Sequence, residues 1–200
     1  MTVATLVTSV RLVLAPLFMV FYLLPIRSNF SELTSVILLW VILAVVEISD
    51  IIDGRIARRT GQVTDLGKLY DPFADVIARM TYFTAFILTG VMPLWTFVVI
   101  MYREFGVLFL RMRLSRKSFA LGAKSLGKLK SFFYFLGTVG ALAFVSLSRL
   151  DLLAGDPAWY RGFETGVGIV FALAALLSVL SFADYLRVAR RVFLEDSREV

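Results

Sequence analysis

The sequence predicts an all-α integral membrane protein that crosses the bilayer six times. Hydrophobic residues make up 59% of the 200 residues and charged residues 18%, and the mean hydropathy is +0.83. Soluble globular domains contain about 45–50% apolar and about 25% charged residues. Because a chain of 22.4 kDa has too little interior to bury this excess, we expect much of it to face lipid.

Six stretches have the roughly 20 apolar residues that a helix needs to cross a bilayer, and they lie near 5–25, 33–52, 68–90, 93–113, 125–148 and 165–187. A tight turn around Gly90 to Pro93 separates the third from the fourth, and polar connectors separate the others. We do not expect the first stretch to be a cleaved signal, because Arg27 and Asn29 follow it instead of a small-residue cleavage site. We find no internal repeat, and we expect residues 1–200 to form one membrane domain.

The basic residues predict the orientation of these spans. Fifteen of the 21 lysines and arginines lie in the connector 55–68, the segment 111–130 and the tail from Arg187, whereas three lie in the alternate connectors. Basic loops stay on the cytoplasmic side of a membrane. We therefore expect a protein of the cytoplasmic membrane with both termini cytoplasmic. The net charge of +6 suits anionic membrane lipids, and a nucleic-acid partner has little support.

The sequence contains no cysteine and no histidine, which limits the chemistry open to it. Disulfides, thiolate nucleophiles, zinc sites made of cysteine and histidine, and imidazole acids or bases are excluded. Catalysis would need carboxylates, lysine, arginine, tyrosine or hydroxyl groups. A bound metal ion would need oxygen ligands.

Four aspartates at the ends of two successive spans form the most informative cluster. Asp50 and Asp53 are three residues apart on the second span, and Asp71 and Asp75 are four apart on the third, so each pair shares a helix face. A short connector joins the spans as an antiparallel hairpin, which can bring the four carboxylates together. Because like charges near hydrocarbon repel strongly, either some are protonated or cations neutralise them. Two oxygen-preferring divalent ions, such as Mg²⁺, Mn²⁺ or Ca²⁺, would balance four aspartates.

Two glycines and an arginine lie beside these acids. Gly54 follows Asp53, and Gly67 lies one turn before Asp71. Because glycine inside a helix costs about 1 kcal/mol relative to alanine, both glycines suggest the close approach of a ligand or another backbone. Arg58 lies one turn beyond Gly54 and is a fixed cation suited to a phosphate. The whole set predicts a pyrophosphate site.

Residues 50–75 read DIIDGRIARRTGQVTDLGKLYDPFAD. This segment resembles the signature of the CDP-alcohol phosphotransferase family, D-x2-D-G-x2-A-R-x8-G-x3-D-x3-D, and it matches every specified position. The resemblance covers most of the chain. It implies the six-helix fold of that family, a homodimer, and transfer of a substituted phosphoryl group from a CDP-linked donor to an acceptor hydroxyl, with release of CMP.

The resemblance also implies a role for each matched residue. Two divalent ions, Mg²⁺ or Mn²⁺, would be held by the aspartates Asp50, Asp53, Asp71 and Asp75. Asp75 would also be the general base that takes the proton of the acceptor. The cytidine and pyrophosphate would be bound by Asp50, Asp53, Gly54, Ala57, Arg58 and Gly67.

Basic residues beyond the motif point to the acceptor. They lie on the fourth span and at the start of the fifth: Arg103, Arg111, Lys124, Lys128 and Lys130. Arg103 lies within the membrane and needs a partner. Its neighbour Glu104 points about 100° away around the helix, so we do not expect the two simply to neutralise each other. A cationic pocket above the metal ions would suit an acceptor that itself carries a phosphate.

This region resembles one branch of the family, the bacterial phosphatidylglycerophosphate synthases. The branch patterns R-E-x6-R, G-K-x-K-T and T-x-x-R-x4-P are met or nearly met by Arg103-Glu104 with Arg111, by Gly127, Lys128, Lys130 and Ser131, and by Thr8, Arg11 and Pro16. The implied donor is CDP-diacylglycerol, and the implied acceptor is sn-glycerol 3-phosphate, at the cytoplasmic side. The chain departs from the branch at Glu47, Tyr70, Val76 and Ser131.

Other functions remain open at this point. A related enzyme could use inositol phosphate, or move phosphocholine from CDP-choline to diacylglycerol, although an acceptor without a phosphate would leave the basic pocket poorly explained. A cation or proton transporter could use the same acids. A non-catalytic membrane assembly protein would leave the clustering of the aspartates unexplained.

Overall fold

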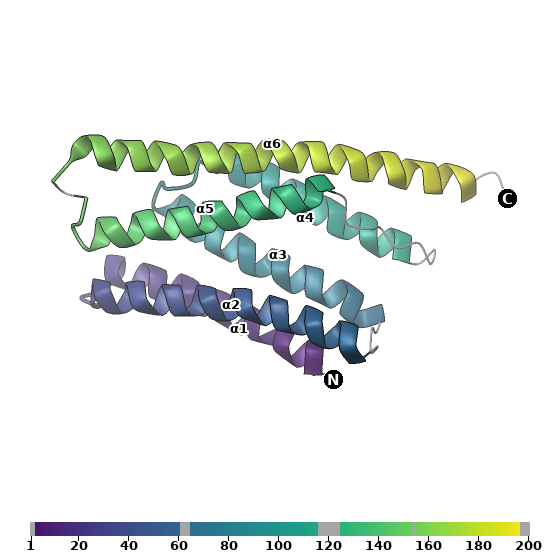
Figure 1. Ribbon diagram of the computed structural model, residues 1–200, viewed down its shortest axis with the longest axis horizontal. Helices are drawn as coiled ribbons and strands as arrows, with labels where there is room; N and C mark the ends of the chain where they lie inside the picture. The colour runs from purple at the N-terminus through teal and green to yellow at the C-terminus, as the bar shows by residue number, and fades with distance from the viewer. Residues whose placement is uncertain (1–2, 61–64, 116–124, 154, 197–200) are drawn as a thin grey trace.

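In the residues that it describes, the computed structural model forms six helices that run up and down in a bundle (Figure 1), which confirms the predicted all-helical fold. It describes residues 3–60, 65–115, 125–153 and 155–196. The helices are α1 (Val3–Arg27), α2 (Glu32–Thr60), α3 (Asp65–Leu88), α4 (Leu94–Ser115), α5 (Ser125–Arg149) and α6 (Pro157–Asp196).

Four helices in the described part of the chain are long and apolar enough to cross a membrane. Their apolar stretches are Thr8–Arg27, Glu32–Asp50, Leu126–Arg149 and Pro157–Arg190. Large apolar side chains on their outer faces, such as Val13, Val41 and Leu176, are exposed, as expected for surfaces in contact with lipid. The chain is therefore a multi-pass membrane protein. Helices α3 and α4 carry more charged side chains within their apolar sequence.

Both termini lie at one end of the bundle (Figure 1). The end of α2, the start of α3 and the end of α4 lie at this same end. We call it the motif end, because it carries the segment 50–75. The alternation of helix directions thus brings the aspartate motif and the basic residues of α4 and α5 to one side of the protein, as the pattern of charged connectors predicts.

Helix α3 packs between α1 on one side and helices α4, α5 and α6 on the other. Phe18 of α1 packs against Tyr82 of α3 with 4.4 Å between ring centroids. On the other side, Phe83 meets Phe171 of α6 edge to face at 5.4 Å. Aromatic pairs in such geometries stabilise a fold by about 0.5–1.5 kcal/mol beyond the area that they bury. These contacts fix the rotation of α3, and with it the direction of the acidic side chains near its start.

The turn between α3 and α4 has the geometry that its glycine predicts. Gly90 adopts a φ of 78°. The amide of Val91 donates to the carbonyl of Phe86 at 2.9 Å, and the amide of Gly90 donates to that of Ile87 at 3.0 Å. This pair of hydrogen bonds is a Schellman motif, in which glycine takes the left-handed position without steric cost. The predicted tight turn is confirmed.

The sixth helix starts earlier than its apolar stretch suggests. It begins at Pro157, eight residues before the predicted span 165–187. The carboxylate of Asp156 accepts hydrogen bonds from the amides of Ala158 at 2.9 Å and Trp159 at 3.2 Å. An aspartate at the cap followed by proline at the first helical position is a strong helix start. Because this capping signal lies in a polar segment, a search for apolar stretches does not detect it.

Candidate active site

Three of the four motif aspartates are described with their side chains, and they line the motif end of α2 and α3. Asp50 lies on α2, and Asp71 and Asp75 lie on α3. The side chains of Asp50 and Asp75 are 61% and 41% exposed. Both line a cavity of about 200 Å³ between α2, α3 and α5, which we call the inner cavity. The structure therefore brings together two acids that the sequence places 25 residues apart.

Helix α1 contacts both aspartate-bearing helices. The guanidinium of Arg11 is buried and lies 3.0 Å from the carboxylate of Asp50. The Nε of Arg11 also donates to Ser49 at 3.3 Å. One turn earlier, the hydroxyl of Thr8 donates to Asp71 at 2.7 Å. A buried arginine needs a counter-charge, which Asp50 provides here. Thr8 and Arg11 of the early sequence pattern therefore orient the acids of α2 and α3.

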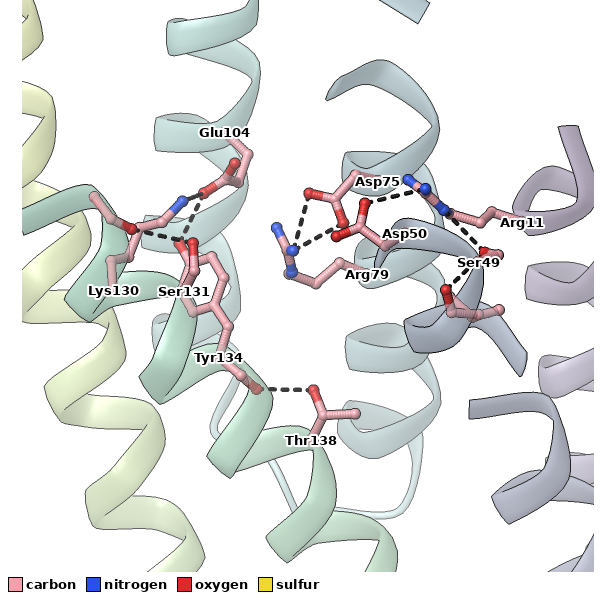
Figure 2. Close-up of polar contacts among 12 residues, drawn as sticks. Arg11, Ser49, Asp50, Asp75, Arg79, Glu104, Lys130, Ser131, Tyr134 and Thr138 are labelled. Carbon is pink, nitrogen blue, oxygen red and sulfur yellow. Dashed lines mark hydrogen bonds and ion pairs between the residues drawn. The ribbon is translucent and has the colours of Figure 1, made fainter. Parts of the chain in front are cut away.

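The carboxylate of Asp75 is held by an arginine from its own helix (Figure 2). Nη2 of Arg79 donates to both carboxylate oxygens at 2.9 Å. The Arg79 guanidinium also lies over the ring of Tyr134, 5.0 Å from its centroid. A carboxylate has about four lone-pair sites, so this contact leaves each oxygen able to accept another group. Sequence reasoning gave Arg79 no role, although a basic residue four positions after an acid within a span was a usable signal.

The side chains of the remaining motif residues lie outside the described part of the chain. Helices α2 and α3 contain these five positions: Asp53, Gly54, Ala57, Arg58 and Gly67. Lys124 also lies outside the described residues. The predicted contacts of these residues with a cytidine diphosphate therefore stay predictions.

The described acids fit a divalent metal in chemistry, without forming a complete site by themselves. Within the described residues, no three carboxylates gather closely enough to hold one ion, and Asp53 is not among the side chains described. The donors at hand are carboxylate oxygens, which hard cations such as Mg²⁺ and Mn²⁺ prefer. Asp50 and Asp75 keep exposed oxygen and share the inner cavity. The donor set therefore fits such an ion.

A second and larger cavity connects Asp75 with the basic residues of α4 and α5. It has a volume of about 410 Å³, and we call it the outer cavity. Five basic and two acidic side chains line it: Arg79, Arg103, Arg111, Lys128, Lys130, Asp75 and Glu104. Four of these basic residues are among those predicted to bind an acceptor phosphate. The excess of positive charge makes the cavity attractive to anions.

The pairing of Arg103 corrects one prediction. Nη1 of Arg103 lies 2.9 Å from Oε1 of Glu104, so the two neighbours do form an ion pair. The angle of about 100° between successive positions on a helix describes where side chains start. A long arginine can curl back along the helix surface to reach a neighbour. Nη2 of Arg103 donates to Ser181 of α6 at 2.9 Å, which ties α4 to α6.

Glu104 is the centre of a buried cluster (Figure 2). Its side chain is 6% exposed, and Lys130 of α5 forms a salt bridge with the same oxygen that Arg103 contacts. The hydroxyl of Tyr134 donates to this oxygen at 2.9 Å. Two buried cations therefore share one anion, and the floor of the outer cavity keeps a net positive charge. Sequence reasoning did not find Tyr134, because only the packing of α5 against α4 brings it to Glu104.

Comparison with known proteins agrees with this arrangement. Residues 1–180 match the family model of CDP-alcohol phosphatidyltransferases. The match covers most of the chain, including every described residue of both cavities except Tyr185. The chain therefore belongs to the CDP-alcohol phosphatidyltransferase family, whose members generally depend on a divalent metal ion.

The names of two relatives refer to phosphatidyl transfer involving a glycerol phosphate. A CDP-diacylglycerol–glycerol-3-phosphate 3-phosphatidyltransferase of Treponema pallidum (strain Nichols) is 35% identical over 139 residues, 70% of this chain and 63% of that protein. The chain thus spans less than two thirds of that relative's length. A "Probable phosphatidylglycerophosphate synthase" of Mycobacterium tuberculosis (strain ATCC 25618 / H37Rv) is 30% identical over 190 residues, 94% of this chain and 81% of that protein.

A third relative carries a different name. A cardiolipin synthase (CMP-forming) of Streptomyces coelicolor (strain ATCC BAA-471 / A3(2) / M145) is 27% identical over 172 residues, 86% of this chain and 74% of that protein. The three relatives therefore do not all carry names of the same reaction.

Proposed function

We propose that this chain moves a phosphatidyl group from CDP-diacylglycerol to the hydroxyl of sn-glycerol 3-phosphate, releasing CMP and phosphatidylglycerophosphate. The observation that carries this proposal is the outer cavity, in which the carboxylate of Asp75 and a group of basic side chains share one space. Such a space suits an acceptor with a hydroxyl at one end and a phosphate at the other. The names of the Treponema and Mycobacterium relatives support the same acceptor.

The basic side chains would hold the acceptor by its phosphate. Arg111 and Lys128 line the outer cavity, and Arg103 and Lys130 lie at its buried floor with Glu104. Charge-assisted hydrogen bonds from arginine and lysine are the strong contacts for phosphate oxygens. Glu104 reduces the positive charge of the floor, so that these cations can be buried without an anion bound. The anchored phosphate would then place the acceptor hydroxyl beside Asp75.

Asp75 would act as the general base. The oxygen of the acceptor hydroxyl forms a bond to the phosphorus of the phosphatidyl group, and the bond from that phosphorus to the bridging oxygen of the pyrophosphate breaks. The electron pair leaves with CMP, and the proton goes to a carboxylate oxygen of Asp75. Without histidine in the chain, a carboxylate is well suited to this task. Arg79 keeps the carboxylate oriented by its two contacts.

The motif aspartates would hold two divalent ions, Mg²⁺ or Mn²⁺, together with the donor. The residues proposed for the metal ions are Asp50, Asp53, Asp71 and Asp75. When bound, such ions neutralise phosphoryl oxygens and orient the donor and acceptor. The cytidine diphosphate would be bound by Asp50, Asp53, Gly54, Ala57, Arg58 and Gly67. Arg11 and Thr8 would keep the acids aligned, since they contact Asp50 and Asp71.

The setting of this reaction is part of the proposal. The basic connectors at the motif end support an active site at the cytoplasmic side of the cytoplasmic membrane, and residues 1–200 would act as one membrane domain. CDP-diacylglycerol would then approach from the surrounding lipid. We also propose a homodimer, as the family resemblance implies; its mass in detergent or nanodiscs would test this directly.

An acceptor screen tests the proposed function. Purified protein with Mg²⁺ or Mn²⁺ and CDP-diacylglycerol is given glycerol 3-phosphate, phosphatidylglycerol, inositol phosphate or serine, and CMP is measured. CDP-choline with diacylglycerol forms a separate reaction. We expect glycerol 3-phosphate to give the fastest release of CMP. Faster release with phosphatidylglycerol would instead support the reaction named for the Streptomyces relative. Cation flux in proteoliposomes without nucleotide would support a transporter.

A further inference from the structure

The inner cavity lies directly beside the outer cavity and has no part in the proposed binding of the acceptor phosphate. Asp75, Arg79 and Ser131 line both cavities. From this shared wall, the inner cavity extends along α2 and α3 away from the motif end, as far as Glu47 and Tyr82. A group that reaches Asp75 from the outer cavity therefore lies at the opening of the inner one.

A buried tyrosine in the inner cavity has no hydrogen-bond partner among the described residues. Tyr82 is 3% exposed, and within the described part of the chain its hydroxyl contacts no donor or acceptor. Burying a hydroxyl without a partner is unfavourable, and such groups are rare in folded proteins. The buried Tyr82 hydroxyl therefore indicates that a polar group of a bound ligand occupies the inner cavity beside it.

The other polar groups of the inner cavity suit a neutral ligand. Its two arginines are each paired with an aspartate, Arg11 with Asp50 and Arg79 with Asp75. Glu47 forms no salt bridge or hydrogen bond with another described residue. A phosphate here would be repelled by the negative charge of the Glu47 carboxylate. A hydroxyl group, in contrast, can donate to Glu47 and accept from Tyr82, so that it satisfies both.

We propose that the inner cavity binds the second hydroxyl of a glycerol-phosphate acceptor, with Glu47 and Tyr82 as its recognition groups. The inference rests on the proposed function, in which the phosphate lies in the outer cavity and the attacking hydroxyl lies at Asp75. The hydroxyl on the neighbouring carbon of glycerol then points past the shared wall into the inner cavity, which Glu47 and Tyr82 line. The same glycerol-phosphate unit occurs in free glycerol 3-phosphate and in the headgroup of phosphatidylglycerol.

The first test compares acceptors with and without that hydroxyl. CMP release from CDP-diacylglycerol is measured with glycerol 3-phosphate and with 3-hydroxypropyl phosphate, which lacks the second hydroxyl. A site built to hydrogen-bond a hydroxyl discriminates against an analogue that lacks it, and for the wild-type protein we expect kcat/KM to fall by about 10- to 100-fold. A parallel arm compares phosphatidylglycerol with phosphatidyl-propanediol. The arm that shows turnover identifies which of the two sources supplies the glycerol-phosphate unit.

The second test asks whether Tyr82 and Glu47 cause that discrimination. In the isosteric Tyr82→Phe variant, and separately in Glu47→Gln, we expect the preference for the acceptor with the second hydroxyl to shrink to about threefold or less. Turnover of 3-hydroxypropyl phosphate should be largely retained. Tyr102→Phe is the matched control, because Tyr102 is 71% exposed on α4 and lines neither cavity. This variant should keep the full preference.

The outcomes separate the two proposals. Equal kcat/KM for both acceptors in the wild-type protein overturns the inner-cavity proposal without any variant. It is also overturned if Tyr82→Phe and Glu47→Gln both keep the wild-type preference. Failure of every glycerol-phosphate acceptor to release CMP overturns the proposed function itself. Turnover of phosphatidylglycerol with loss of rate on the deoxy headgroup would correct the acceptor and support the inner cavity.

Discussion

The site has two halves that differ in how exposed their acidic side chains are: an acidic half at α1, α2 and α3, and a basic half at α4 and α5. At α1, α2 and α3, Asp50 and Asp75 are each paired with one arginine and remain largely open, with 61% and 41% of their side chains exposed. At α4 and α5, the single carboxylate Glu104 is buried and shared by two cations and a tyrosine hydroxyl. In the acidic half, the carboxylate oxygens of the aspartates stay accessible. In the basic half, the only carboxylate described is paired with buried cations, so the surface of the cavity is positively charged.

This difference explains how one small bundle can bind cations and anions side by side. A carboxylate that remains exposed can take a metal ion, whereas the buried carboxylate of Glu104 already pairs with two cations and accepts from a tyrosine hydroxyl. Arg79 lies between the two groups (Figure 2), paired with Asp75 and packed on Tyr134. It therefore separates the acidic half from the basic half and links both to α3.

The largest effect is expected at the boundary between the halves. Replacing Asp75 by Asn removes the proposed base while keeping the shape of the side chain. We expect kcat for CMP release to fall by about 10³-fold, in the middle of the range for general-base catalysis. Asp184→Asn is a matched control, since Asp184 pairs only with exposed Arg187 among the described residues. Full turnover by the Asp75 variant would rule out its role as the base.

The next effect concerns stability. Glu104→Gln leaves Arg103 and Lys130 buried without their shared anion. Removing one partner of a buried ion cluster costs about 3–5 kcal/mol, so we expect a clear loss of thermal stability in detergent. The Asp184→Asn protein should change by less than about 1 kcal/mol, as exposed pairs do. Equal stability of the two variants would show that Glu104 is not the counter-charge that holds this half together.

A smaller effect is expected at the open side of the basic half. Arg111→Gln removes one cation from the outer cavity without emptying a buried ion pair. We expect KM for glycerol 3-phosphate to rise by about tenfold, in line with the loss of one charge-assisted hydrogen bond. The KM for CDP-diacylglycerol should stay the same. A fall in kcat with unchanged KM for the acceptor would contradict phosphate binding at this residue.

The smallest expected effect is the loss of activity at low pH, which concerns the aspartates of the acidic half. Protonation of metal-binding carboxylates weakens metal affinity, so activity should fall as the pH is lowered, and excess Mg²⁺ or Mn²⁺ should restore it by about a few-fold. Initial rates over a matrix of pH and metal concentration measure this. Activity indifferent to both variables would count against aspartates as metal ligands.

Local patterns predicted the fold well, together with the proximity of two motif aspartates. Apolar stretches located the helices, and Gly90 located the tight turn. Helical spacing and the hairpin predicted that Asp50 and Asp75 would lie close together, and they share a cavity. These predictions succeeded because each depends on periodicity within a helix or on a short connection between two helices.

Features that depend on how distant helices rotate and pack were beyond local patterns. Tyr134 reaches Glu104 across 30 positions of sequence, and Arg103 meets Ser181 across 78. The ion pair of Arg103 with Glu104 was missed because spacing describes the helix surface and not the path of a flexible side chain. The spacing of four residues predicts the contact of Arg79 with Asp75, but only the packing of α3 against α5 brings the guanidinium over Tyr134.

One measurement tests the central claim that an acidic, metal-dependent half and a basic, phosphate-binding half act on one reaction. CMP release from CDP-diacylglycerol is followed while glycerol 3-phosphate and Mg²⁺ or Mn²⁺ are each omitted in turn. We expect CMP release to depend on the divalent ion and on glycerol 3-phosphate together. CMP released equally well without the divalent ion, or with glycerol in place of glycerol 3-phosphate, would contradict it.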